Sequence, residues 1–202
     1  MNSKINLITW LMSIIIASAT LNATAQVYPN SGDQSVCQFS NEPYGVDYTS
    51  TSTYAWSIIP VTGGNGTITV GATPNLISVN WETTGTCTLQ LIETNDAGCS
   101  VTVTITITVN PTPAPVIAGA EEVCTGNTET YDVAFTDGNT YLWTISGGTI
   151  ETGQGTNQVT VNWTGPSSGS LSVTETAGSC SAEATKDVII NALPATLTIF
   201  HN

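Results

Sequence analysis

Apolar and polar residues alternate strictly over residues 101–109, which read Val-Thr-Val-Thr-Ile-Thr-Ile-Thr-Val. This alternation places the valines and isoleucines on one face of a strand and the threonines on the other, as in a half-buried antiparallel strand. Shorter segments of the same character lie at residues 67–70, 76–81, 89–93, 158–163, 171–175 and 185–190. Turns rich in glycine and asparagine separate these segments, and no segment after residue 25 has a helical period. The pattern predicts an all-β protein.

An internal repeat organises the chain: the block from Cys37 to Asn110 recurs from Cys124 to Asn191. In both copies the first tryptophan follows the first cysteine by 19 positions. The shared landmarks are Tyr54-x-Trp56 and Tyr141-x-Trp143, Val79-Asn80-Trp81 and Val161-Asn162-Trp163, and the strand ends at Glu93 and Glu175. A near-constant offset over several landmarks indicates two copies of one structural unit.

The strand count of each copy predicts its fold. About seven short strands in roughly 85 residues are typical of an immunoglobulin-like sandwich. We therefore expect two tandem immunoglobulin-like β-sandwiches joined by a proline-rich linker. Alternate prolines make such a linker extended and semi-rigid. The expected divisions are a signal peptide over residues 1–25, sandwiches over 26–110 and 116–191, the linker over 111–115, and a C-terminal linker and tail strand over 192–202.

Four tryptophans form the candidate core and a candidate binding surface. Trp56 and Trp143 lie within predicted strands, and we expect them to fill the cores because aromatic side chains dominate small cores. Trp81 and Trp163 lie at the ends of predicted strands. Two interpretations stay open for this second pair: the side chains cap the core, or they face a ligand and stack on sugar rings.

Residues 1–25 have the features of a secretory signal peptide. Lys4 precedes an apolar stretch over residues 5–17, and Ala23-Thr24-Ala25 is a small-x-small cleavage site. No later apolar run is long enough to span a membrane. The mature chain is therefore expected to be exported, without a transmembrane segment, to the periplasm, the outer-membrane surface or the extracellular space.

The charge of the chain excludes two classes of partner. The chain has fifteen acidic residues and only two basic residues, Lys4 and Lys186, so its formal net charge is −13. Nucleic acids and anionic lipids need clustered cations, so neither is an expected partner. We expect no cofactor. Calcium is the minor alternative, because acidic loops could supply the six or more oxygens that it needs. Its candidate ligands are Asp33, Asp47, Asp96, Asp132 and Asp137.

Export permits disulfides, and the chain has five cysteines. The repeat pairs Cys37 with Cys99 and Cys124 with Cys180, although the sequence alone leaves other pairings open. Cys87 has no counterpart, because a glycine occupies the equivalent position of the second copy. We expect it to be a buried free thiol, with an intermolecular disulfide as the alternative.

The last residues read like the first strand of a further unit. Leu197, Ile199 and Phe200 alternate with polar residues after a second linker. One interpretation is a frayed tail or a strand that packs back on the second sandwich. The other is a strand donated to the sheet edge of a partner, since main-chain pairing is a general mode of recognition.

The residues needed for catalysis are not found in a usable arrangement. The chain has a single histidine, His201, next to the C-terminus. A nucleophile–histidine pair needs a well-placed imidazole. Glu93 and Glu175 could act as paired carboxylates only if they met, yet each lies alone in its own copy. The prediction is that the protein is not an enzyme, with no catalytic residue and no metal site.

Taken together, Tyr54-x-Trp56, Val79-Asn80-Trp81 and Gly98-Cys99, with their equivalents in the second copy, resemble the PKD-like domains repeated in surface proteins of Bacteroidota. Such domains are common in gliding motility and type IX secretion. The resemblance implies a non-enzymatic structural or interaction protein of the cell envelope that binds protein partners or itself. The alternative is a carbohydrate-binding module that uses exposed tryptophans and takes a glycan as its partner.

Overall fold

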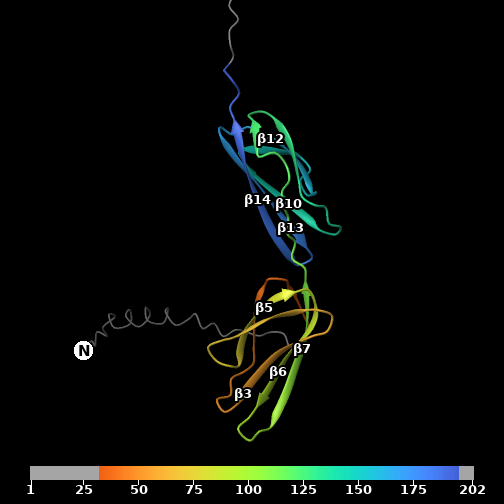
Figure 1. The fold of residues 1–202 in the computed structure, drawn as a ribbon, viewed down its shortest axis with the longest axis vertical. Coiled ribbons are helices and arrows are strands. Elements are labelled where there is room, and N and C mark those ends of the chain that lie inside the picture. Colours follow the sequence, from red (N-terminus) through yellow and green to blue (C-terminus); the bar gives the residue numbers. More distant parts are fainter. Residues whose placement is uncertain (1–31, 196–202) are drawn as a thin grey trace, which may run out of the picture. The chain divides into compact units, whose positions relative to one another are not determined.

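The computed structural model describes residues 32–195. The first sandwich consists of seven strands in two sheets, in the orders β1-β7-β6-β3 and β2-β5-β4. Figure 1 shows β3, β6 and β7 of the first of these sheets. The strands are β1 (Gln34–Cys37), β2 (Asn41–Gly45), β3 (Thr53–Pro60), β4 (Asn65–Val70), β5 (Leu76–Thr83), β6 (Gly85–Thr94) and β7 (Ser100–Asn110).

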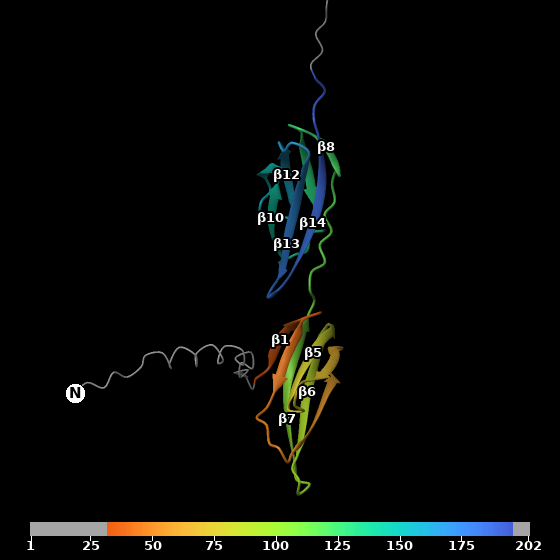
Figure 2. The same cartoon turned by 90° about the vertical axis from the view of Figure 1, so that its left-hand side faces the viewer.

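The second sandwich repeats this topology, with sheets in the orders β10-β13-β14-β8 and β11-β12-β9. In each sandwich the first strand pairs in parallel with the last, while the remaining pairs are antiparallel. Figure 2 shows β8 and β14 of this second sandwich. The strands are β8 (Glu122–Cys124), β9 (Thr128–Asp132), β10 (Thr140–Ser146), β11 (Gly148–Thr152), β12 (Gln158–Trp163), β13 (Ser168–Ala177) and β14 (Cys180–Asn191).

This arrangement confirms the predicted fold class of an all-β chain with two immunoglobulin-like sandwiches. Residues 32–195 contain no helix. Within this range there is also no helix long and apolar enough to cross a membrane. The expected signal peptide and the tail residues Leu197, Ile199 and Phe200 lie outside the described residues.

Each sandwich has its own core, built around a tryptophan on the smaller sheet. Ile77, Val79 and Trp81 alternate along β5, so all three side chains point to the same face and are at most 3% exposed. The core of the second sandwich contains Val159, Val161 and Trp163 in the same way. Burying apolar surface of this size is the main source of stability in so small a unit.

These positions decide between the two interpretations of Trp81 and Trp163: both side chains belong to the cores, and the ligand-facing alternative is wrong. Both side chains are 0% exposed. The segment predicted to end at Trp81 continues as a strand to Thr83, so this tryptophan lies inside the sheet. Trp143 is also buried, and Trp56 is partly buried against the first core. A sugar platform built on Trp81 and Trp163 is therefore excluded.

The alternating strand at residues 101–109 is only half buried along its length. Ile107 and Val109 lie in the core, whereas Val101 and Val103 are 54% and 48% exposed. The β6–β7 hairpin is longer than the strands of the facing sheet, so its tip extends beyond them. The pattern predicted the direction of each side chain correctly, but the length of the facing sheet limits burial.

Candidate functional site

The same side-chain hydrogen bond joins two strands in the core of each sandwich. The indole Nε1 of Trp81 donates to Tyr44 Oη at 3.3 Å, and that of Trp163 donates to Tyr131 Oη at 3.2 Å. The rings of each pair meet edge to face, a favourable geometry for aromatic pairs. Burial raises the pKa of Tyr44 to about 12 and also raises that of Tyr131.

A second repeated contact holds the loop before the third strand. The hydroxyl of Tyr54 accepts from the backbone N–H of Thr49 at 2.7 Å. In the second sandwich Tyr141 accepts from the N–H of Thr136 at 2.8 Å. These tyrosines are the first residue of each Tyr-x-Trp landmark, so part of the repeated sequence serves to anchor a loop.

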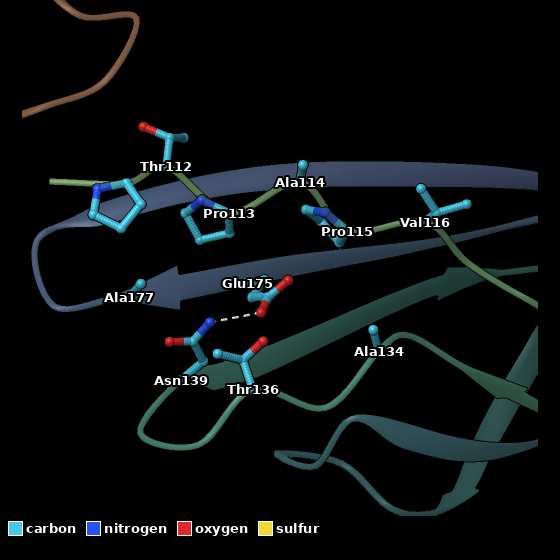
Figure 3. A pocket seen from close by; sticks show the side chains of 11 residues that line it. Thr112, Pro113, Ala114, Pro115, Val116, Ala134, Thr136, Asn139, Glu175 and Ala177 are labelled. Atoms are coloured by element: carbon cyan, nitrogen blue, oxygen red, sulfur yellow. Dashed lines mark hydrogen bonds between the residues drawn. The ribbon is translucent and has the colours of Figure 1, made fainter. Parts of the chain in front are cut away.

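The linker borders a cavity on the second sandwich. The chain just after the linker is fixed to this sandwich, because Ala118 and Asp132 exchange two backbone hydrogen bonds and Ile117 packs in the second core. The cavity has a volume of about 370 Å³. Figure 3 shows linker residues on one side of it and residues of the second sandwich on the other. The lining is Pro111, Thr112, Pro113, Ala114, Pro115, Val116, Ala134, Thr136, Asn139, Glu175 and Ala177.

Glu175 is the one ionisable side chain among these lining residues. It is 5% exposed and accepts a hydrogen bond from Asn139 Nδ2 at 2.6 Å, drawn as a dashed line in Figure 3. Its repeat equivalent Glu93 lies at the end of β6 in the other sandwich. The two glutamates therefore do not form a pair of catalytic carboxylates. A single carboxylate among prolines and alanines can accept hydrogen bonds from a ligand.

A disulfide between Cys37 and Cys180 joins the two sandwiches. The predicted pairs, Cys37 with Cys99 and Cys124 with Cys180, are wrong. In this structure Cys99 and Cys124 are free thiols, the first exposed and the second partly exposed.

Strand register explains why the predicted pairs cannot form. Cys37 lies opposite Asn110 at the end of β7, whereas Cys99 immediately precedes the start of β7. Eleven strand residues lie between those two ends, and at ~3.3 Å per residue they span roughly 36 Å. A disulfide needs Cα atoms within about 7 Å. The same separation divides Cys124 from Cys180 along β14.

Cys87 lies on β6 and is a buried free cysteine. Its side chain is 0% exposed and belongs to the first core. Burial raises the pKa of its thiol, which lowers its reactivity because the thiolate is the nucleophile. Cys87 therefore behaves as a small apolar core residue, and an intermolecular bond through it would require the core to open.

The aspartates considered for calcium are distributed over separate loops and strands. Asp33 Oδ1 accepts from the N–H of Thr106 at 3.1 Å, and Asp132 lies at the end of β9. Asp96 is in the turn between β6 and β7. Among residues 32–195 no group of three or more histidine, cysteine, aspartate or glutamate side chains is arranged to hold a metal ion.

The fold and its contacts define a class of tandem immunoglobulin-like sandwich modules. Residues 110–190, which comprise the linker and nearly all of the second sandwich, match the family model of the PKD-like domain. The first sandwich shares the repeated landmarks and the strand order of this matched region. No curated protein matches the chain.

Several solved structures show weak similarity to this chain. Murine CEACAM1b is 13% identical, with 79% of this chain and 96% of that chain covered and a TM-score of 0.33. The titin domains Z1Z2 in complex with telethonin are 14% identical, with 81% and 94% covered and a TM-score of 0.32. SGBP-B of Bacteroides ovatus, in complex with a mixed-linkage heptasaccharide, is 17% identical, with 78% and 42% covered and a TM-score of 0.31. None of these similarities is close enough to assign a function.

Proposed function

We propose that this chain is a non-enzymatic, extracytoplasmic structural and interaction protein that acts as a tension-resistant spacer at the cell surface. Its setting is adhesion or gliding motility, including the machinery of type IX secretion. The observation that carries the proposal is the Cys37–Cys180 disulfide, which covalently ties together two copies of one sandwich. An exported protein can form and keep such a bond, because disulfides persist in oxidising compartments.

The pairing of first and last strands suits a protein under tension. In the first sandwich β1 and β7 run in parallel, from Gln34 opposite Ile107 to Cys37 opposite Asn110. When the disulfide is reduced, force applied to the two ends of a sandwich pulls these strands in opposite directions along their length. The hydrogen bonds between them are then loaded together in shear, rather than one at a time. The parallel pair β8–β14 repeats this geometry in the second sandwich.

The disulfide also changes the route of the force through the molecule. Tension on the chain ends passes along β1 to Cys37, crosses the disulfide to Cys180 and continues along β14. Residues 38–179 lie outside this covalent path. Both strands on the path are already extended, so little length remains to be gained from them. A spacer of this kind keeps its length under load even where a sandwich opens.

The surface chemistry is compatible with this role. The described residues contain a single cation, Lys186, which forms an exposed ion pair with Glu121 at 3.4 Å. A strongly acidic chain repels other acidic surfaces and stays soluble, which limits non-specific contacts. Specific binding would then depend on defined surfaces, such as the cavity beside the linker.

A deletion strain of the source organism tests the proposal. We expect loss of surface adhesion or of gliding, restored by the wild-type gene and restored less well by a gene encoding Cys37→Ser and Cys180→Ser. Affinity capture of the native envelope complex should identify the protein partner. Normal adhesion and gliding in the deletion strain, or turnover of a substrate by the purified protein, would contradict the proposal.

A further inference from the structure

The two exposed or partly exposed thiols, Cys99 and Cys124, are the repeat equivalents of the two bonded cysteines. Cys124 ends β8 as Cys37 ends β1. Cys99 immediately precedes Ser100, which pairs with Thr94. Cys180 immediately precedes Ser181, which pairs with Thr176. Each sandwich therefore has two types of cysteine at its opposite ends. One type ends the first strand (Cys37 or Cys124), and the other lies where the last strand begins (Cys99 or Cys180). Only one cysteine of each type is bonded within the chain.

The turn that holds Cys124 is built like the turn that holds Cys37. After Cys37, the N–H groups of Gln38, Phe39 and Ser40 donate to the carbonyls of Asn110, Trp81 and Cys37 at 2.7, 2.6 and 3.1 Å. After Cys124, those of Thr125, Gly126 and Asn127 donate to Asn191, Trp163 and Cys124 at 2.9, 2.7 and 3.0 Å. Phe39 and Gly126 both have a positive φ, of 67° and 85°. The cysteine at the end of the second sandwich is thus presented in the same backbone conformation as its bonded equivalent.

The two cysteines at the other end of each sandwich differ in exposure. Cys180 is 1% exposed, whereas Cys99 is exposed in its turn. The turn around Cys99 is well defined, because the N–H of Cys99 donates to Asn95 Oδ1 at 2.9 Å. An exposed thiol on a fixed turn is accessible for thiol–disulfide exchange.

We infer that Cys124 of one protein molecule bonds to Cys99 of a second molecule, so that the protein forms head-to-tail covalent oligomers of itself. This bond is the intermolecular equivalent of Cys37–Cys180. Because the two ends of each molecule differ, the contact between molecules is heterologous. Repetition of this contact leads to an open chain or a ring. The inference depends on the cysteine geometry and is independent of the proposed function at the cell surface.

Bond formation is a two-electron oxidation for which a low-molecular-weight disulfide is a sufficient oxidant. The thiolate of Cys99 attacks that disulfide, forms a mixed disulfide and releases one reduced small thiol. The thiolate of Cys124 then attacks the sulfur of Cys99 and releases the second small thiol. Two protein thiols lose two protons and two electrons, and one small disulfide becomes two thiols.

Oxidation of the mature protein in a glutathione redox buffer tests the inference by non-reducing electrophoresis. The wild type should give a ladder of oligomers that a reductant collapses to monomer. Cys99→Ser and Cys124→Ser should each stay monomeric, because each keeps only one of the two accessible free thiols. An equimolar mixture of the two variants should give a dimer and no larger species. Cys87→Ala is the matched control and should keep the ladder.

Peptide mapping identifies the bond directly. Cleavage after glutamate places all five cysteines in separate peptides, with Cys99 in residues 94–121 and Cys124 in residues 123–129. We expect these two peptides to be linked in the dimer of the mixed variants. Blocking the exposed thiols of the folded wild type with iodoacetamide should abolish the ladder without any substitution.

Three results would overturn the inference. The first is a wild type that stays monomeric under oxidation, with both thiols free. The second is a monomer in which Cys99 and Cys124 are linked within one chain. The third is single variants that dimerise as extensively as their mixture, because random oxidation of exposed thiols would then account for the oligomers.

Discussion

Cys37 and Cys180 are bonded to each other although 143 residues separate them along the chain. This bond removes nearly the whole of both sandwiches from the path of a force applied to the chain ends. Single-molecule stretching should therefore show almost no gain in length for the oxidised protein. After reduction, the 143 residues at ~3.4 Å each should add roughly 480 Å as the sandwiches unfold.

Cys37→Ser is the matched control for this stretching experiment. It should behave under oxidising conditions as the wild type does after reduction, with one unfolding event for each sandwich. Two full unfolding events in the oxidised wild type would show that the disulfide does not carry the load.

The hydrogen bond from Trp81 to Tyr44 predicts the effect of removing one hydroxyl. Tyr44→Phe leaves the Nε1–H of Trp81 buried without a partner, and such a loss typically lowers the free energy of unfolding by about 1–3 kcal/mol. Tyr131→Phe should have a similar effect on the second sandwich through Trp163. Urea unfolding followed by tryptophan fluorescence measures both changes.

The raised pKa values of Tyr44 and Tyr131 predict a loss of stability in alkali. In the unfolded chain a tyrosine ionises near its ordinary pKa of 10.0, whereas burial raises the pKa of Tyr44 to about 12 in the folded state. The unfolded state thus loses its proton first as the pH rises. The stabilising contribution is complete below about pH 10 and falls progressively towards pH 12.

Urea midpoints measured from about pH 9 to pH 11.5, on protein with its free thiols blocked, should therefore decrease with pH. Tyr44→Phe should flatten this decrease for the first sandwich, although the variant is less stable at neutral pH. An equally steep decrease in the variant would assign the alkaline effect to other groups.

The period-two pattern and the repeat were enough to predict the fold. Alternation along residues 101–109 identified β7, and the landmarks identified two equivalent units, because local preference and register agree in these strands. The burial of Trp81 could also have been predicted. It follows Ile77 and Val79 at intervals of two residues, so the three side chains share one face. The tyrosine partners carry a weaker signal: Tyr44 and Tyr131 each follow the first cysteine of their copy by seven residues.

The disulfide pairing could not be predicted from the repeat. A repeat shows which cysteines are equivalent, but not which end of a sandwich each one occupies. Only the parallel pairing of β1 with β7 places Cys37 and Cys99 at opposite ends. The cavity beside the linker could not be predicted from the sequence either, because its lining combines residues 111–116 with Asn139 and Glu175 from distant parts of the sequence.

Gly169 and Cys87 occupy equivalent positions in the two copies, yet the first sandwich accommodates a side chain there and the second does not. A Cβ atom on Gly169 would lie 2.3 Å from Cζ3 of Trp163 and 2.7 Å from the carbonyl oxygen of Ser146. Gly169→Ala should therefore force Trp163 or the backbone to shift and destabilise the second sandwich by about 1–3 kcal/mol, as overpacking of a core typically does. Gly32→Ala is the matched control, because a Cβ atom at Gly32 meets nothing within 4 Å and should leave stability unchanged. Thermal unfolding should show the loss only for Gly169→Ala. Equal melting temperatures for the two variants would mean that the core around Trp163 has room for a methyl group and is packed less tightly than the structure indicates.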